Sequence, residues 1–234
     1  MRRRRFFWAR LPAEGERAPL PAELAHYARN VLRLPVGTSI ELFNGEGRAV
    51  EATLLDDGVE ITRPVPFVAG AVPMQLACPL LKGERSDWLL EKLTELGIAS
   101  FMPLDCERAV IRELSSNKRT RFERVIEAAC RQCGRNDRLR LAELTPLSAL
   151  PPGVFLDPTA TAPFDVLCDE LFSNANRGGQ LLTVAIGPEG GFSSDEREHL
   201  LARSWRSARL SAHVLRAETA ALMAASVAAM RWAG

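Results

Sequence analysis

Residues 185–196, AIGPEGGFSSDE, carry the pattern that decides the fold of the second half of the chain. The apolar residues before Gly187 are typical of a buried strand, and the glycines and Pro188 that follow predict a tight turn. Ser193 and Glu196 have the spacing of a capping box, which predicts that a helix opens at Ser193. A buried strand that runs through a short turn into a helix is the connection typical of α/β folds.

Strand and helix patterns alternate on both sides of this stretch, from residue 74 onward. Continuous apolar strands separated by helices predict a parallel sheet covered by helices on both faces. The predicted strands are MQLACPLL (74–81), IASFMPL (98–104), VFLD (154–157), LLTVAIG (181–187) and SARL (207–210). The predicted helices are SDWLLEKLTELG (86–97), NKRTRFERVIEAACRQCG (117–134) and ETAALMAASVAAMRWA (218–233).

Residues 1–63 have a different pattern, in which short strand-like runs surround one segment with helical spacing, PAELAHYARNVLRL (21–34). An Asn-Gly pair at 44–45 predicts a hairpin turn. A small β-barrel with one helix fits this pattern, and the Pro- and Gly-rich stretch 63–73 is interpreted as a linker. The predicted strands are FFWARL (6–11), TSIELF (38–43), RAVEATLL (48–55) and GVEITR (58–63).

The bulk composition limits the class of protein but does not identify a partner. The 234 residues are 47% hydrophobic, which is enough for one large or two small domains, and the formal net charge is only +1. No stretch reaches the length of a membrane span, so we expect a cytoplasmic protein that binds no membrane. A single CxxC pair, Cys130 and Cys133, without a cluster of histidines predicts no metal site, and five cysteines in an intracellular chain predict no disulfides.

A second turn between a strand and a helix lies in LSAHVLRAETAA, residues 210–221. Taken alone, its Arg216 and Glu218 are explained by an ion pair and by a carboxylate near the helix dipole, and the glycine turn by a tight connection. Neither turn has the pattern of a phosphate loop or a dinucleotide fingerprint. Because ligands of α/β sheets bind beyond the carboxyl ends of the strands, we expect the two turns to wall one pocket.

Five segments in order give the chain a resemblance to a known family: KGERSDWLLEKLTELGI, ERAVI, EAACRQCGRN, IGPEGGF and VLRAETA. They resemble the RsmE family, the 16S ribosomal RNA uridine-N3 methyltransferases of the SPOUT superfamily. HYARNVLRLPVG, near residue 30, is similar to the N-terminal signature of the same family. The resemblance therefore covers nearly the whole chain, and the ordered set is more specific than any one motif.

The resemblance implies an α/β protein of two domains. Residues 1–70 would form a PUA-like β-barrel that binds RNA, and residues 73–234 a SPOUT domain, a parallel sheet with a trefoil knot. It also implies a homodimer that takes part in ribosome biogenesis, with S-adenosyl-L-methionine as cofactor and ribosomal RNA of the small subunit as partner.

The resemblance also implies where the cofactor binds: after VFLD, at the glycine turn and at the second turn. Two positions depart from the family, since Ser211 stands where glycine is usual and His213 where arginine is common. Serine at a position that required a positive φ would be strained. The implied cofactor-binding residues are Leu156, Ile186, Gly187, Glu189, Gly190, Gly191, Leu210, Val214, Leu215, Arg216, Glu218 and Thr219.

The implied reaction is methyl transfer to N3 of uracil, which becomes a good nucleophile only as its proton leaves. Negative charge then develops on the ring oxygens, where an arginine stabilises it. Arg108 in ERAVI and Arg135 in QCGRN match family positions and are the predicted catalytic residues; without the family, each is interpreted as a solvated arginine. The proton acceptor stays open between Glu189, Glu218 and water.

Two other functions stay open at this point. One is a related knotted methyltransferase with a different RNA target, such as a transfer RNA ribose. The other is a non-catalytic RNA-binding factor of ribosome assembly that has kept the fold.

Overall fold

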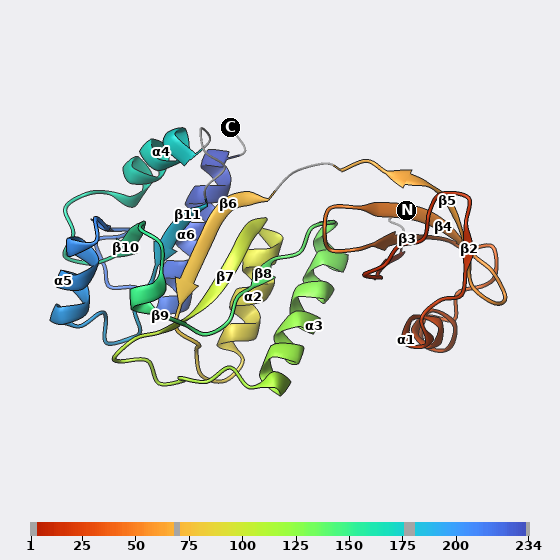
Figure 1. Ribbon diagram of the computed structural model, residues 1–234, viewed down its shortest axis with the longest axis horizontal. Coiled ribbons are helices and arrows are strands. Elements are labelled where there is room, and N and C mark those ends of the chain that lie inside the picture. Colours follow the sequence, from red (N-terminus) through yellow and green to blue (C-terminus); the bar gives the residue numbers. More distant parts are fainter. Residues whose placement is uncertain (1–3, 68–70, 176–180, 233–234) are drawn as a thin grey trace. The chain divides into compact units, whose positions relative to one another are not determined.

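The computed structural model describes residues 4–67, 71–175 and 181–232, apart from the side chains of 173–175, and the chain divides into two compact units (Figure 1). The first unit consists of residues 1–70 together with 127–138, and the second of residues 71–126 and 139–234. The division predicted between 70 and 73 did not include the return of residues 127–138 to the first unit.

The first unit contains a five-stranded sheet in the order β1-β3-β4-β5-β2, with β1 parallel to β3 and the other pairs antiparallel. A short helix, α1, continues into a π-helical turn at Tyr27–Val31, as the helical spacing predicts. The predicted first strand, 6–11, is wrong in its bounds, because Phe7 pairs with Phe43, which is the last residue of β3. The elements are β1 (Arg4–Phe7), β2 (Arg17–Ala18), α1 (Ala22–His26), β3 (Ser39–Phe43), β4 (Ala49–Leu54) and β5 (Val59–Val65).

The hairpin between β3 and β4 confirms the turn predicted from the Asn-Gly pair. The Asn44 side-chain Oδ1 accepts hydrogen bonds from the main-chain N–H groups of Glu46 (2.9 Å) and Arg48 (3.0 Å). Phe6, Leu42 and other apolar side chains of the strands form the buried core of this unit.

A buried arginine joins β1 to residues 127–138 within the first unit. Arg5 donates from Nη1 to the carbonyl oxygen of Cys130 (3.1 Å) and from Nη2 to that of Arg135 (3.2 Å). Its Nε lies 2.8 Å from Glu41 Oε1. The bonds to Cys130 and Arg135 span more than a hundred residues of sequence, which explains why a segment so distant in the chain belongs to this unit.

The second unit contains a seven-stranded sheet in the order β12-β10-β11-β6-β7-β8, with β9 also paired to β7, and every recorded pair is parallel. The predicted α/β class with a parallel sheet is confirmed; the knot implied by the resemblance stays a prediction. The strands are β6 (Val72–Cys78), β7 (Ile98–Asp105), β8 (Arg140–Leu141), β9 (Thr145–Pro146), β10 (Val154–Leu156), β11 (Leu182–Ala185) and β12 (Arg206–Ala208). The helices are α2 (Arg85–Glu95), α3 (Ser116–Cys133), which continues into the first unit, α4 (Phe164–Ala175), α5 (Ser194–Ala202) and α6 (Ala217–Trp232).

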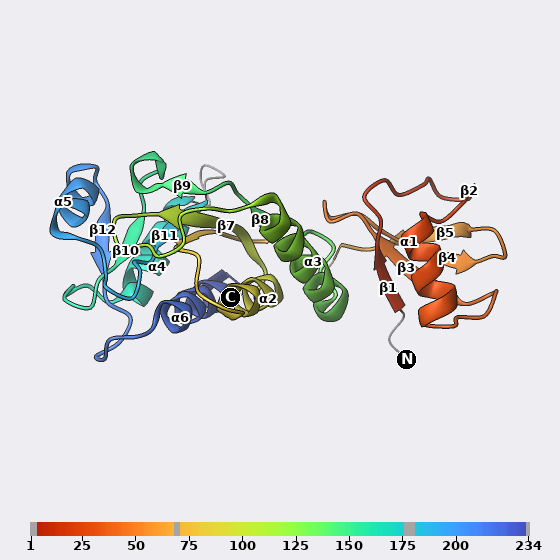
Figure 2. The ribbon, with the colours of Figure 1, turned by 90° about the horizontal axis from the view of Figure 1, so that it is seen from below.

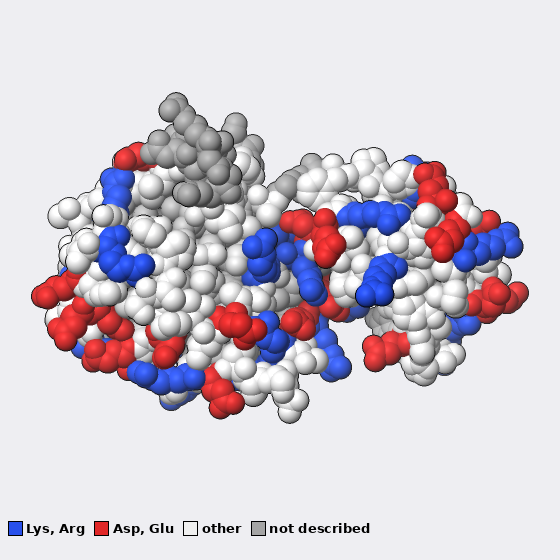
Figure 3. All heavy atoms as spheres, viewed as in Figure 1, with Lys and Arg blue, Asp and Glu red and all other residues white. Residues whose placement is uncertain are grey.

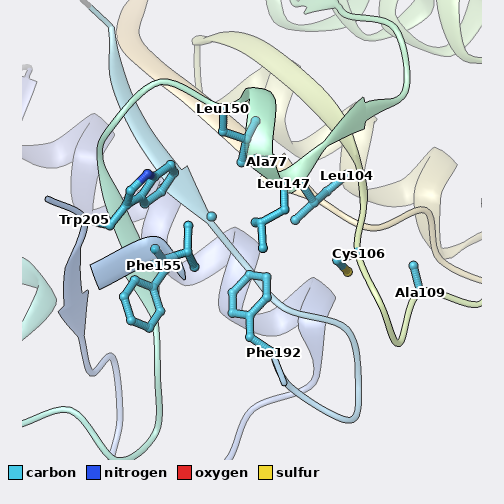
Figure 4. Close-up of a cluster of buried hydrophobic side chains, with 11 residues drawn as sticks. Ala77, Leu104, Cys106, Ala109, Leu147, Leu150, Phe155, Phe192 and Trp205 are labelled. Atoms are coloured by element: carbon cyan, nitrogen blue, oxygen red, sulfur yellow. The ribbon is translucent and has the colours of Figure 1, made fainter. Parts of the chain in front are cut away.

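Helices α2, α4 and α6 pack together on one face of this sheet, and Figure 2 shows α2 and α6 side by side there. The opposite face is covered by a cluster that includes Phe155 of β10, Phe192 and Trp205 (Figure 4). Among the described helices, none combines the length and the apolar character that a membrane crossing requires. Figure 3 shows acidic and basic side chains interspersed over the visible face of each unit, in agreement with the small net charge.

Candidate functional site

A cavity of about 430 Å³ lies beyond the carboxyl ends of β10, β11 and β12. The three loops that leave these strands form most of its wall, together with one turn of α6 and the side chain of Arg108 from the loop after β7. The two turns singled out by the sequence therefore meet around one cavity, as predicted from the edge of a parallel sheet.

Nine of the twelve residues predicted to bind the cofactor line this cavity, and three do not. Arg216, Glu218 and Thr219 are absent from its lining. The nine that line it are Leu156, Ile186, Gly187, Glu189, Gly190, Gly191, Leu210, Val214 and Leu215.

The glycine turn has a backbone that other residues would not adopt without strain. Gly191 has φ of +68° and donates its N–H to the carbonyl oxygen of Pro188 (2.8 Å). A Cβ on Gly187 would lie only 3.0 Å from the main-chain nitrogen of Phe192. The Phe192 ring meets Phe155 edge-on, with ring centroids 6.2 Å apart (Figure 4). The turn is thus anchored to the core directly beside the cavity.

The predicted capping box is confirmed, and its Glu196 also holds the loop that follows β7. Ser193 Oγ accepts from the N–H of Glu196 (3.3 Å), and Glu196 Oε2 accepts from the N–H of Ser193 (2.9 Å). The other carboxylate oxygen of Glu196 accepts from the N–H of Glu107 (2.7 Å). Next to it, Arg108 Nη1 donates to the carbonyl oxygen of Gly190 (2.6 Å). Arg108 is therefore held against the glycine turn at the cavity.

Arg85, the first residue of α2, links the glycine turn to the start of α6, and the sequence reasoning gave it no role. Its Nη1 lies 2.8 Å from Glu189 Oε1 and 3.5 Å from Glu218 Oε1. The hydrogen bond from Arg85 lowers the pKa of the Glu189 carboxyl and raises that of the guanidinium. The lowered pKa makes Glu189 a weaker base, which argues against it as the proton acceptor. Arg85 lies within KGERSDW, but no local pattern shows which carboxylates it meets.

A buried carboxylate in the cavity wall was also missed. Asp157 is 7% exposed, and its Oδ1 accepts from the N–H (2.8 Å) and the hydroxyl (2.7 Å) of Thr159. Its Oδ2 lies 2.7 Å from Nη2 of Arg197. All three residues line the cavity. The available signal was the position of Asp157, a polar residue directly after the apolar VFL strand.

Arg135, the second predicted catalytic residue, does not line the cavity. It belongs to the first unit, its side chain is 8% exposed, and its Nη2 lies 3.0 Å from Asp137 Oδ2.

The two departures from the family, Ser211 and His213, both line the cavity. Among the described residues other than glycine, only Arg33 and Ser204 have a positive φ, so Ser211 carries no strain of that kind. Its Oγ accepts a hydrogen bond from the N–H of His213 (3.1 Å). Serine therefore fits this loop without the backbone that would demand glycine.

Comparison with known proteins gives consistent similarities along the chain. A family model described as an RNA methyltransferase domain matches residues 70–229, and one described as an RNA methyltransferase PUA domain matches residues 20–58. The chain is 25% identical to the ribosomal RNA small subunit methyltransferase E of Bacillus subtilis (strain 168), over 95% of this chain and 94% of that protein.

Two solved structures have the same fold. One is a ribosomal RNA small subunit methyltransferase E from Neisseria gonorrhoeae bound to S-adenosyl methionine, with a TM-score of 0.83, 24% identity, and coverage of 99% of this chain and 98% of that one. The other is a putative methyltransferase from Legionella pneumophila in complex with the same cofactor, with a TM-score of 0.79, 26% identity and coverage of 97% of each chain.

Proposed function

The chain belongs to the RsmE family of RNA methyltransferases, and from this premise we propose that it uses S-adenosylmethionine to methylate N3 of a uridine in 16S ribosomal RNA of the small subunit. The observation that carries the proposal is the cavity, which is walled by the IGPEGGF and VLRAETA segments. Neither segment identifies a ligand alone, but together they form a site at the strand ends where α/β folds bind ligands.

The cavity has the properties that this cofactor requires. Its volume of about 430 Å³ lies in the range of small-molecule sites, and Leu156 and Ile186 give it apolar walls. Within the described part of the chain, the main-chain N–H groups of Leu210 and Leu215 have no acceptor, so they are available to a bound molecule. When bound, S-adenosylmethionine supplies a methyl group made electrophilic by a sulfonium. We assign its binding to the nine predicted residues that line the cavity.

Arg108 is our candidate for the group that stabilises the reacting base. Loss of the N3 proton leaves negative charge on the uracil oxygens, and a fixed guanidinium at the cavity lowers the energy of that charge. The contact between Arg108 and the Gly190 carbonyl supports this role, because it fixes the side chain before the base arrives. Arg135, which does not line the cavity, stays a prediction from the resemblance. Glu218 does not line the cavity and its carboxylate contacts Arg85, so water is our candidate for the proton acceptor.

We also propose that the protein acts as a homodimer in the cytoplasm, where small ribosomal subunits are assembled. Met223 and Met230 lie two turns apart on α6 and are 39% and 76% exposed, which supports contact through this helix. Sedimentation should give twice the chain mass, and Met230→Glu should shift the protein toward monomer. A wild-type protein that stays monomeric at micromolar concentration would contradict the dimer.

Mass spectrometry of nucleosides from 16S ribosomal RNA tests the function. A deletion strain should lack one N3-methyluridine, the wild-type chain should restore it, and Arg108→Met should not. Unchanged N3-methyluridine in the deletion strain would end the proposal. Loss of a ribose methylation instead would assign the chain to the related methyltransferases with another RNA target.

A further inference from the structure

The charges that line the cavity do not cancel. Asp157 is paired with Arg197, and Glu189 shares Arg85, which lies outside the lining, with Glu218. Among the described residues, no carboxylate lies in an ion pair with Arg108 or Arg209. The charged residues in the lining are Arg108, Asp157, Glu189, Arg197 and Arg209. Three arginines and two carboxylates give the lining a net charge of +1, and Arg108 and Arg209 are the arginines without a carboxylate partner.

This excess does not suit the cofactor. S-adenosylmethionine carries a sulfonium, an ammonium and a carboxylate, so at neutral pH it has one net positive charge of its own. Unpaired guanidinium groups at the same cavity repel that charge. They suit instead a polyanion that shares the site with the cofactor, and the phosphates of RNA have this chemistry.

Arg209 has the better geometry for a phosphate. Its main chain is fixed on both sides, because its N–H donates to the carbonyl oxygen of Ala162 (2.9 Å) and its carbonyl oxygen accepts from the N–H of Phe164 (3.0 Å). Its side chain is exposed, and the part of the chain that the structure describes offers its guanidinium no hydrogen-bond acceptor. Arg108, by contrast, already donates one hydrogen bond, from Nη1 to the Gly190 carbonyl oxygen. A guanidinium on a fixed backbone with its fork of donors free matches the two oxygens of a phosphate.

We propose that Arg209 binds a phosphate of the substrate RNA strand at the rim of the cavity and so positions the target nucleotide. This inference rests on the proposed function, because it takes RNA to be the substrate. The two arginines without a carboxylate partner then have different roles. Arg209 binds the RNA backbone in the ground state, and Arg108 stabilises the negative charge on the reacting base.

The test is the salt dependence of RNA binding. Small ribosomal subunits from the deletion strain are titrated with the full-length protein, with cofactor present, from about 50 mM to about 400 mM KCl. One lost phosphate contact should reduce the slope of log affinity against log salt by about 0.7–0.9, so Arg209→Met should show that reduction and Arg209→Lys should retain most of the slope. In turnover assays Arg209→Met should raise KM for the subunit roughly fivefold and leave kcat within about twofold.

Arg206→Met is the matched control. Arg206 lies three residues earlier, on β12, and its Nη1 is 2.8 Å from Glu170 Oε1; it does not line the cavity. Its slope and its affinity for S-adenosylmethionine should equal those of the wild type, whereas Arg209→Met should bind the cofactor no more weakly than the wild type, because it removes a positive charge from the cavity. An unchanged slope for Arg209→Met, or equal changes in both variants, would overturn the inference while methylation by the wild type still stood. Absence of methylation by the wild type would overturn the proposed function itself.

Discussion

Arg5 in the first unit and Arg209 in the second place the same guanidinium group in opposite surroundings. The Arg5 side chain is 5% exposed and meets Glu41, Phe43 and main-chain carbonyls. The Arg209 side chain is exposed at a cavity and has no acceptor among the described residues. Burial and pairing therefore distinguish the arginines that stabilise the fold from the arginines that are available to a ligand.

The largest effect is expected where this comparison predicts a structural role. Arg5→Met leaves the Glu41 carboxylate, 17% exposed, without its partner, so the free energy of unfolding should fall by about 3–5 kcal/mol. Urea denaturation measures this loss. The control is Arg17→Met, because the Arg17 pair with Glu60 is solvent-exposed and should contribute no more than about 1 kcal/mol. Equal losses of unfolding free energy in the two variants would show that Arg5 has no special structural role.

The next effect concerns catalysis and should leave stability unchanged. Arg108→Met removes the cation proposed to stabilise the uracil anion, so kcat should fall by roughly 10²–10³. Steady-state turnover on unmethylated small subunits measures this fall, with the melting temperature as a check on folding. A variant that keeps more than about half of the wild-type kcat would show that Arg108 is not the stabilising group.

A smaller effect is expected at Arg85, which pairs with Glu189 on the glycine turn of the cavity and with Glu218 on the first turn of α6. Arg85→Met should weaken S-adenosylmethionine binding roughly threefold to tenfold, because Glu189 and Glu218 lose their common partner. Arg85→Lys should restore part of the affinity. Calorimetric titration measures both, and an affinity equal to that of Arg206→Met would contradict a positioning role.

The same ion pair gives a pH dependence. Arg85 lowers the pKa of Glu189, so the contribution of the pair is complete above the ordinary carboxyl value of 4.5 and is lost as the pH falls through the lowered value. Cofactor affinity attributable to this pair should therefore be constant from about pH 6 to about pH 8. A decline within that interval that disappears in Glu189→Gln would contradict the assignment.

Features set by neighbouring residues were predictable from the sequence. The capping box of Ser193 and Glu196 and the turn at Asn44 depend on hydrogen bonds within four residues, and both are confirmed. The meeting of the two cavity turns followed from a general property of parallel sheets. In each case local spacing or the sheet edge determined the outcome.

Features set by distant partners were not predictable. The return of residues 127–138 to the first unit depends on the hydrogen bonds of Arg5. The spacing of apolar residues along the sequence cannot indicate a contact between residues so far apart in the chain. Arg85 was quoted within a motif but given no role, because its carboxylates come from other parts of the chain. Glu218 was predicted to bind the cofactor, yet it does not line the cavity and its carboxylate meets Arg85.

Calorimetric titration of the full-length protein with S-adenosylmethionine most directly tests whether the strand-end cavity is the cofactor site. The wild type should bind one molecule per chain. Ala220→Phe, which places a ring in the cavity that Ala220 lines, should lose that binding while it keeps a cooperative unfolding transition. A wild-type protein that binds none, or a folded Ala220→Phe variant that binds as tightly as the wild type, would contradict the account.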